Sequence, residues 1–131
     1  MGTTMVMASI EGDKVTIAHV GDSRCYLQRQ SEGLLYQTED HVRIDFGWEI
    51  VSRCFFSYRP ETAVPVIRQF AIQKGDRILL CSDGLYKSMA SDILQARMLD
   101  GKPLEDILDV FDFLCQKQSD DNYTAILIEI E

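Results

Sequence analysis

The chain has 131 residues, with 13 Lys and Arg against 21 Asp and Glu, for a formal net charge of -8. This length suits one domain, and a hydrophobic share of 46% excludes a largely disordered chain. The acidic balance argues against a nucleic-acid partner or an anionic membrane surface, because both attract basic patches. No apolar run approaches the roughly 20 residues of a transmembrane helix, and we expect no signal peptide, since no basic region precedes a long apolar stretch.

The four cysteines give no sign of a metal site. They are Cys25, Cys54, Cys81 and Cys115. None forms a CxxC pair, and no histidine lies near one at zinc-finger spacing. Buried, reduced thiols are the simplest interpretation, which predicts a cytoplasmic protein without disulfides.

The first third of the sequence predicts β-structure. Thr3–Ile10 is rich in β-branched and apolar residues, and the turn sequence Glu11–Lys14 follows it. Val15–Val20 has apolar residues on both faces, as in a strand covered on both sides in a sandwich core. Gly21–Ser23 interrupts this strand, and Arg24–Leu27 resumes a strand pattern. We expect these three strands to form a meander.

The middle of the chain is less regular. Gly33–Gln37 predicts a short strand, whereas Asp40–Glu61 shows no clear period and predicts a compact irregular loop. The aromatic residues of this loop are Phe46, Trp48, Phe55, Phe56 and Tyr58. We interpret them as a small satellite core under the loop, with a peptide-binding surface as the alternative.

The C-terminal half predicts strands, then helices, then a last strand. The hydrophobic period changes from 2 to 3.6 after Asp83-Gly84, and returns to strict alternation near the C-terminus. One long helical face is apolar and includes Ile107, Phe111 and Cys115. The expected strands are Val66–Ile72, Arg77–Ser82 and Asn122–Ile130. One helix is expected from an N-cap at Ser91 to Met98, and a second helix is expected with Pro103 in its first turn.

Three carboxylates share one kind of position. Asp22, Asp83 and Asp121 each lie at the junction between an apolar strand and a turn. Rigidly held carboxylates that water can reach are the oxygen ligands that Mg²⁺ and Mn²⁺ prefer, and two such ions can activate water against a phosphoryl group. The alternative is that these aspartates only stabilise turns, since Gly-Asp-Ser and Ser-Asp-Gly are ordinary turn sequences.

Four sequence segments occur in a fixed order along the chain. They are Gly2–Thr4, Val20–Arg24, Gly75–Leu85 and Asp121–Thr124. Each is weakly specific alone, but the ordered set resembles the bacterial metal-dependent Ser/Thr protein phosphatases of the PPM family. The resemblance runs from residue 2 to about residue 130.

The resemblance implies an α+β fold, an antiparallel β-sandwich flanked by helices. It implies that Asp83 and Asp121 bind metal, that Asp22 helps to hold a third ion, and that metal-activated water hydrolyses phosphoserine or phosphothreonine. Phosphoprotein targets of a Ser/Thr kinase would then be the substrates. Supporting positions are Gly21, Ser82, Gly84 and Asn122.

Two departures from the family pattern limit these expectations. The upstream Asp-Gly-x-Gly-Gly motif, whose Asp bridges two metal ions in the family, is absent. We therefore expect residues 1–131 to form one incomplete domain, and we interpret Met1 as an internal methionine of a longer parent. The flap segment at about residues 40–61 is shortened, which leaves substrate selection open. We therefore expect weak Mg²⁺ or Mn²⁺ binding and little activity from this chain alone; the alternative is a non-catalytic regulatory or binding module.

Two further expectations concern histidines and association. His19 lies within a strand and is expected to be packed, and His41 is expected to have a local structural role. Because strands of the missing part would lie beside those present, open sheet edges are expected to favour a dimer or higher oligomer.

Overall fold

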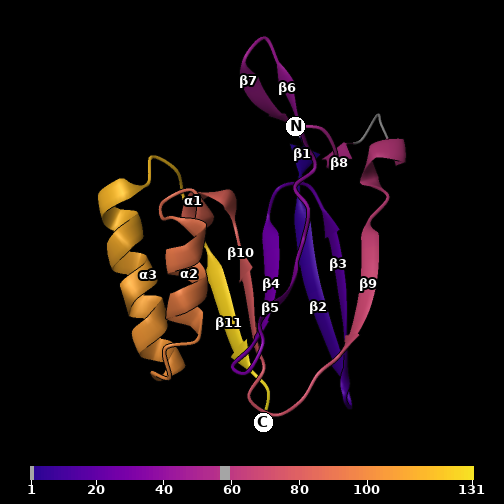
Figure 1. Cartoon of the computed structure of the whole chain (residues 1–131). Helices are drawn as coiled ribbons and strands as arrows, with labels where there is room; N and C mark the ends of the chain where they lie inside the picture. Colours follow the sequence, from indigo (N-terminus) through magenta and orange to yellow (C-terminus); the bar gives the residue numbers. More distant parts are fainter. Residues whose placement is uncertain (1, 57–59) are drawn as a thin grey trace.

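Two antiparallel sheets face each other, and a layer of helices covers one of them (Figure 1). The computed structural model describes residues 2–56 and 60–131. The four-stranded sheet has the order β11 (Ala125–Glu129), β10 (Arg77–Cys81), β4 (Arg24–Arg29) and β5 (Gly33–Gln37). The three-stranded sheet has the order β2 (Met5–Glu11), β3 (Lys14–Val20) and β9 (Val66–Ala71). The predicted α+β sandwich is confirmed, and the last strand is shorter than predicted.

The predicted meander of the first three strands is wrong. β3 lies between β2 and β9, whereas β4 lies between β10 and β5 in the other sheet. Both edges of β3 are thus already paired, and the turn at Gly21–Ser23 carries the chain across to the second sheet. Strand periodicity reports burial but not the pairing partner, which is why the sequence did not reveal this crossing.

The sandwich core forms where the two sheets meet. Alternate residues of β3 and β4 point into it, among them Val15, Ile17, Cys25 and Leu27, all fully buried. The opposite face of the four-stranded sheet forms a second core with the helices. Its fully or nearly fully buried residues include Tyr26, Leu79, Leu94, Met98, Ile107, Phe111 and Cys115. Two cores therefore share β4 and β10, one on each side.

The helices begin slightly differently from the sequence prediction. α2 covers Ser91–Met98, but its N-cap is Ala90, and the Ser91 hydroxyl accepts a hydrogen bond from the Gln95 side chain at 3.1 Å instead. α3 covers Leu104–Gln118, so Pro103 is its N-cap residue and not part of the first turn. The predicted apolar face of α3 is confirmed, because its buried residues are Ile107, Phe111 and Cys115.

The outer face of the three-stranded sheet has no such cover. In the part of the chain that the structure describes, α-helices lie only against the four-stranded sheet (Figure 1). Met7, Ala18 and Ile67 form a cross-strand row on β2, β3 and β9. Met7 is 46% exposed and Ile67 is 55% exposed. This sheet thus exposes apolar side chains that its counterpart buries.

Residues 42–51 form a hairpin that projects from the body (Figure 1). β6 (Val42–Asp45) pairs with β7 (Trp48–Val51), so the predicted irregular loop is wrong there. The predicted satellite core is also wrong for Phe46 and Trp48, which are 102% and 75% exposed at the tip. An isolated two-stranded ribbon is too small to build a hydrophobic core of its own, which explains why apolar residues here stay in solvent.

The remaining short elements lie at the base of the hairpin. β8 (Phe55–Phe56) pairs with β1 (Gly2–Thr3), and the 3-10 helix η1 covers Pro60–Ala63. Met1 and Tyr58 lie outside the described residues, so the expectations about them are not resolved. No helix among the described residues is long and apolar enough to cross a membrane. All four cysteines are buried, as predicted.

Candidate functional site

Two of the predicted aspartates lie near each other at the place where the chain crosses from one sheet to the other. Asp22 lies in the β3–β4 crossing and is 8% exposed, whereas Asp83 follows β10 as the first residue of α1 (Asp83–Tyr86). Burial raises the pKa of Asp22 above its ordinary value, the Asp83 carboxylate raises it further, and Lys87 opposes the shift. The two carboxylates are thus close enough to repel each other, which a bound cation would relieve.

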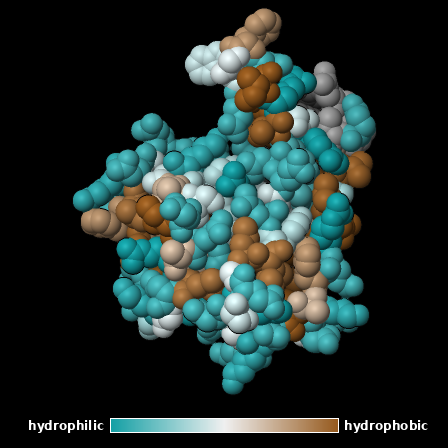
Figure 2. All heavy atoms as spheres, viewed as in Figure 1, coloured by the Kyte–Doolittle hydropathy of each residue, from teal (hydrophilic) through white to brown (hydrophobic). Residues whose placement is uncertain are grey.

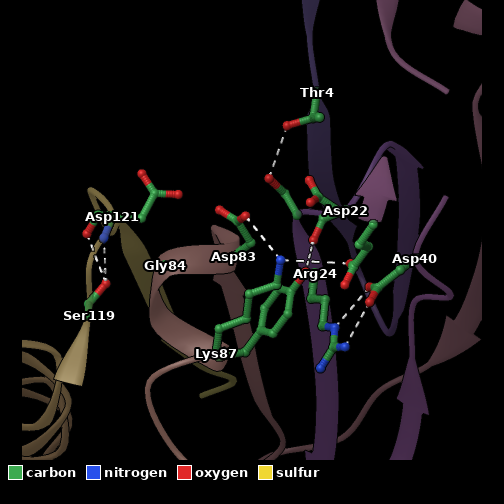
Figure 3. A network of polar contacts seen from close by, with 12 residues as sticks. Thr4, Asp22, Arg24, Asp40, Asp83, Gly84, Lys87, Ser119 and Asp121 are labelled. Carbon is green, nitrogen blue, oxygen red and sulfur yellow. Dashed lines mark hydrogen bonds and ion pairs between the residues drawn. The ribbon is translucent and has the colours of Figure 1, made fainter. Parts of the chain in front are cut away.

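A stack of side chains fixes the Asp22 backbone (Figure 3). The Tyr86 hydroxyl donates to the Asp22 carbonyl oxygen at 2.6 Å. The Arg24 guanidinium lies 3.6 Å from the centre of the Tyr86 ring and donates two hydrogen bonds to the Asp40 carboxylate, at 2.9 and 2.7 Å. Sequence reasoning missed this stack. Arg24 lay in a segment already singled out, but nothing in the sequence reveals its partners.

Gly84 brings the third aspartate toward the same place. A Cβ at Gly84 would collide with the backbone oxygen of Asn122, so only glycine lets α1 approach the loop that precedes β11. In that loop the Asn122 N–H donates to the Asp121 carboxylate at 2.8 Å, and the Ser119 hydroxyl donates to the Asp121 carbonyl oxygen at 2.9 Å. Asp121 is exposed and held by its own loop (Figure 3).

Ser82 ties the end of β10 to the start of β11. The Thr124 N–H donates to the Ser82 hydroxyl at 3.0 Å, and the Ser82 N–H donates to the Thr124 carbonyl oxygen at 3.1 Å. These bonds extend the β10–β11 pairing beyond the last ladder residues. They therefore set the separation between the segments that carry Asp83 and Asp121.

Gly21 links the Asp22 turn to both histidines. Its φ of +110° is one that glycine adopts readily, and a Cβ there would collide with Thr4. The Gly21 N–H donates to His41 Nδ1 at 3.0 Å, and His41 stacks on His19 with ring centres 4.5 Å apart. His19 is 1% exposed, and its Nε2 lies 2.8 Å from the Glu39 carbonyl oxygen. The predicted structural roles of His19 and His41 are confirmed.

Lys87 is the cation at the site, and sequence reasoning did not single it out. Its Nζ lies 3.5 Å from Asp83 Oδ2 and 3.7 Å from Glu49 Oε1 on the hairpin (Figure 3). Lys87 also lines an open cavity of about 200 Å³ with Asp120 and Asp121. The ammonium group thus faces carboxylates from two parts of the chain, α1 and the hairpin.

The donor set only partly fits a metal ion. Carboxylate oxygens of Asp22, Asp83 and Asp121 match the chemistry that Mg²⁺ and Mn²⁺ require. Among residues 2–56 and 60–131, however, no group of three or more His, Cys, Asp or Glu side chains converges closely enough to hold an ion. The site therefore has the right kind of ligand, but too few of them in one place.

The ordered segments agree with the known proteins that the chain resembles. The family model described as Protein phosphatase 2C matches residues 1–129. The chain belongs to this family. The serine/threonine phosphatase stp of Listeria monocytogenes is 30% identical over an alignment 147 residues long, gaps included. The alignment covers 98% of this chain and 57% of that protein. PstP of Mycobacterium tuberculosis is 23% identical over 99% of this chain and 28% of its own length.

Solved structures give the same result for the fold. The S. agalactiae serine/threonine phosphatase superposes with a TM-score of 0.84 at 26% identity, covering 99% of this chain and 60% of that one. The Mycobacterium tuberculosis phosphatase PstP/Ppp superposes with a TM-score of 0.83 at 23% identity. Another structure is the catalytic domain of PstP in complex with two manganese ions, with a TM-score of 0.72. The chain thus has the fold of this family while spanning about 57% of the length of its Listeria relative.

Proposed function

We propose that this chain supplies part of the catalytic domain of a metal-dependent protein serine/threonine phosphatase. The observation that carries the proposal is the proximity of Asp22, in the crossing between the two sheets, to Asp83, at the start of α1 (Figure 3). The Asp83 carboxylate raises the pKa of Asp22. The approach of Gly84 to Asn122 supports a third ligand from Asp121. Mg²⁺ or Mn²⁺ bound there would supply Lewis-acid activation of water toward a phosphoryl group.

The site residues have separate parts in this proposal. Asp83 and Asp121 would be direct metal ligands, and Asp22 would help to hold a third ion. Tyr86 would keep Asp22 in place through its hydrogen bond to the Asp22 carbonyl oxygen. Gly21, Ser82, Gly84 and Asn122 would set the backbone around these three carboxylates. The remaining ligands would come from a segment that carries the Asp-Gly-x-Gly-Gly motif.

The substrates would be phosphoserine and phosphothreonine in proteins that a Ser/Thr kinase modifies. Residues 1–131 would form one partial domain, and the hairpin would be the shortened flap that lies at about residues 40–61. A cytoplasmic location is supported by the buried thiols of Cys25, Cys81 and Cys115.

Hydrolysis of p-nitrophenyl phosphate in the presence of Mn²⁺ tests the proposal. We expect the chain alone to turn over little substrate, because the ligands present are too few to fix two ions at the separation that the reaction needs. Joining the chain to the preceding segment of the Listeria phosphatase should raise turnover, and Asp83→Asn should abolish that gain. Robust turnover by the 131-residue chain alone would contradict the expectation of an incomplete site.

A non-catalytic binding module on the same scaffold is the second candidate. The observation that favours it is the lack of three converging ligands among the described residues. An in-frame Asp-Gly-x-Gly-Gly segment in the coding sequence just upstream of Met1 would decide against the module. Mn²⁺ binding that Asp83→Asn weakens would count in the same direction.

The open sheet edges support a proposal that the chain self-associates. β2 is unpaired on the side opposite β3, and its residues Met5–Ile10 include no charge to discourage another strand. Beside it lies an open groove of about 340 Å³, lined among others by Val6, Leu80 and Ile126. Figure 2 shows apolar side chains gathered on this face of the molecule.

Sedimentation over a range of concentrations tests this association. We expect a mass that rises with concentration, because burying an apolar groove and an unpaired strand edge outweighs repulsion between the acidic copies. A monomer mass that does not change with concentration would contradict it. Added salt should strengthen the association, since it screens the net charge of -8.

A further inference from the structure

His41 joins the crossing between the two sheets to the base of the hairpin. Its backbone N–H donates to the Gly21 carbonyl oxygen at 3.0 Å, and its Nδ1 accepts a hydrogen bond from the Gly21 N–H, also at 3.0 Å. Val42, the next residue, begins β6, and the His41 carbonyl oxygen accepts a hydrogen bond at 2.8 Å from the N–H of Ser52, which follows β7. One residue therefore holds the crossing turn and both ends of the hairpin together.

These hydrogen bonds fix which ring nitrogens carry protons. Because the Gly21 N–H is a donor, His41 Nδ1 presents its lone pair, and the proton of the neutral ring is on Nε2. His19 stacks on this ring with centres 4.5 Å apart, and its Nε2 donates to the Glu39 carbonyl oxygen at 2.8 Å. His19 Nδ1 is buried with no hydrogen-bond partner, so a proton on it would be an unsatisfied buried charge. The arrangement thus suits two neutral rings.

A protonated His41 ring does not fit the bond to Gly21. The second proton goes onto Nδ1, where it points at the Gly21 N–H, so that two donors face each other. The same proton places a positive charge against the buried ring of His19. His41 is half-buried and lines an open cavity of about 220 Å³, which lets protons reach it from solvent.

Charged and titratable groups face His41 from several elements. Burial lowers the pKa of His41 below its ordinary value, a second histidine and an arginine lower it further, and two carboxylates oppose the shift. A tyrosine and an arginine line the same cavity. In chain order these groups are His19 of β3, Tyr36 of β5, Glu39 and Asp40 before β6, Arg53 after β7 and Arg68 of β9.

We propose that His41 is an acid-sensitive switch, in which protonation of its ring breaks the side-chain bond to Gly21 and loosens the sheet crossing and the base of the hairpin together. The inference needs no bound ion and does not depend on the proposed function. The backbone bond from His41 to Gly21 remains, so the opening is partial and reversible. Since the turn that loosens also carries Asp22, acid would make the position of this carboxylate less fixed.

The direction of the pH dependence follows from the lowered pKa. The opened state binds the proton more tightly than the closed state, because opening returns the ring to water and frees Nδ1. The closed contact is therefore fully present above the ordinary histidine pKa of roughly 6.5, and it is lost as pH falls from there through the lowered value. The loss of one such hydrogen bond should raise local opening about two- to ten-fold.

NMR spectra of the chain between neutral and mildly acidic pH test the proposal. At neutral pH the ring nitrogens of His41 should show a lone pair on Nδ1. As pH falls, the His41 ring and the Gly21 amide should titrate with one midpoint, and the protection factors of the Gly21 and Ser52 amides against hydrogen exchange should fall about two- to ten-fold. The amides of β10 and β11 should keep their protection. The chain has only two histidines, which makes the ring signals simple to assign.

Two variants separate the hydrogen-bond acceptor from the ring. His41→Asn supplies a side-chain oxygen that accepts from the Gly21 N–H but does not titrate, so protection of Gly21 should stay high across the pH range. His41→Phe keeps a ring against His19 but has no acceptor, so protection should be low at every pH. His41→Asn also leaves Asp22 in place, so titration of that neighbouring carboxylate does not account for a difference between this variant and the original chain.

The outcomes decide between the switch and its alternatives. A fall in Gly21 protection that persists in His41→Asn would overturn the switch and place the cause in His19 or Asp22. Protection of Gly21 that stays constant while the His41 ring titrates would also overturn it. A fall at Gly21 without one at Ser52 would overturn the coupling to the hairpin. The comparison of His41→Asn with the original chain is sufficient for all three, even where His41→Phe does not fold.

Discussion

The two sheets of this molecule have similar inner faces and very different outer faces. The four-stranded sheet buries its outer face under α2 and α3, where Leu79 and Phe111 are almost fully inaccessible. The three-stranded sheet leaves Met7 and Ile67 exposed on its outer face. The comparison teaches that an antiparallel sheet of this molecule buries its outer apolar residues only where helices pack on it. The chain spans about 57% of the length of the Listeria phosphatase.

The largest expected difference comes from truncating one buried residue of the helix layer and one exposed residue of the uncovered sheet. Phe111→Ala removes a side chain that is 1% exposed and should lower the free energy of unfolding by about 4 kcal/mol. Ile67→Ala removes a side chain that is 55% exposed and should cost less than about 1 kcal/mol. Urea unfolding of both variants measures this. Equal losses would mean that the outer face of the three-stranded sheet is covered in solution.

The next effect concerns the connection between the two sheets. Asp76, in the β9–β10 connection, is fully buried and accepts two hydrogen bonds from Arg29 of β4, both at 2.9 Å. Burial alone would raise the pKa of Asp76, but the bonds from Arg29 and from the Gln73 N–H outweigh it and lower the pKa. Asp76→Asn should cost about 3 kcal/mol at neutral pH, because Arg29 loses its buried partner and keeps only the exposed Glu32 at 3.8 Å.

The pH dependence of this loss has a definite sign. A lowered pKa in the folded state means that the stabilisation is present above the ordinary aspartate pKa and is lost as pH falls through the folded-state value. The gap in unfolding free energy between the original chain and Asp76→Asn should therefore narrow in acid. A gap that stays constant from neutral pH to strong acid would show that the charge of Asp76 is not what stabilises the connection.

The smallest change in stability is expected at the open groove. Ile126 and Leu127 are neighbours on β11 that face opposite sides, with exposures of 55% and 9%. Ile126→Lys should change the unfolding free energy by less than about 1 kcal/mol, yet weaken self-association about ten-fold, because it places a charge in the groove. Sedimentation gives the association, and urea unfolding gives the stability. Association that survives Ile126→Lys would place the contact elsewhere than in the groove.

Local patterns predicted much of this fold. The apolar runs of β3 and β10 and the face of α3 follow from burial on one or two sides, so the sequence reveals them directly. The three aspartates stood out because each lies at the junction of a strand and a turn, and because they belong to segments with an ordered resemblance. The crossing at Gly21 was not predictable, since a strand pattern does not name its partner. Trp48 was wrongly predicted to be buried, because large apolar residues usually lie in a core.

The contacts around the site were harder to predict from the sequence than its three aspartates. Tyr86 and Lys87 act on Asp22 and Asp83 through space, and neither stood out by type or spacing. Arg24 and Asp40 are 16 residues apart and pair only because β4 and the segment after β5 run side by side. Such contacts depend on tertiary packing, which a single sequence does not specify.

Mn²⁺ titration followed by NMR tests the central claim most directly, namely that Asp22, Asp83 and Asp121 belong to one metal site. We expect the signals of these three residues and their neighbours to broaden together, and we expect Asp83→Asn to suppress the broadening at Asp22 and Asp121 as well. Broadening scattered over the acidic surface, or unaffected by Asp83→Asn, would contradict it.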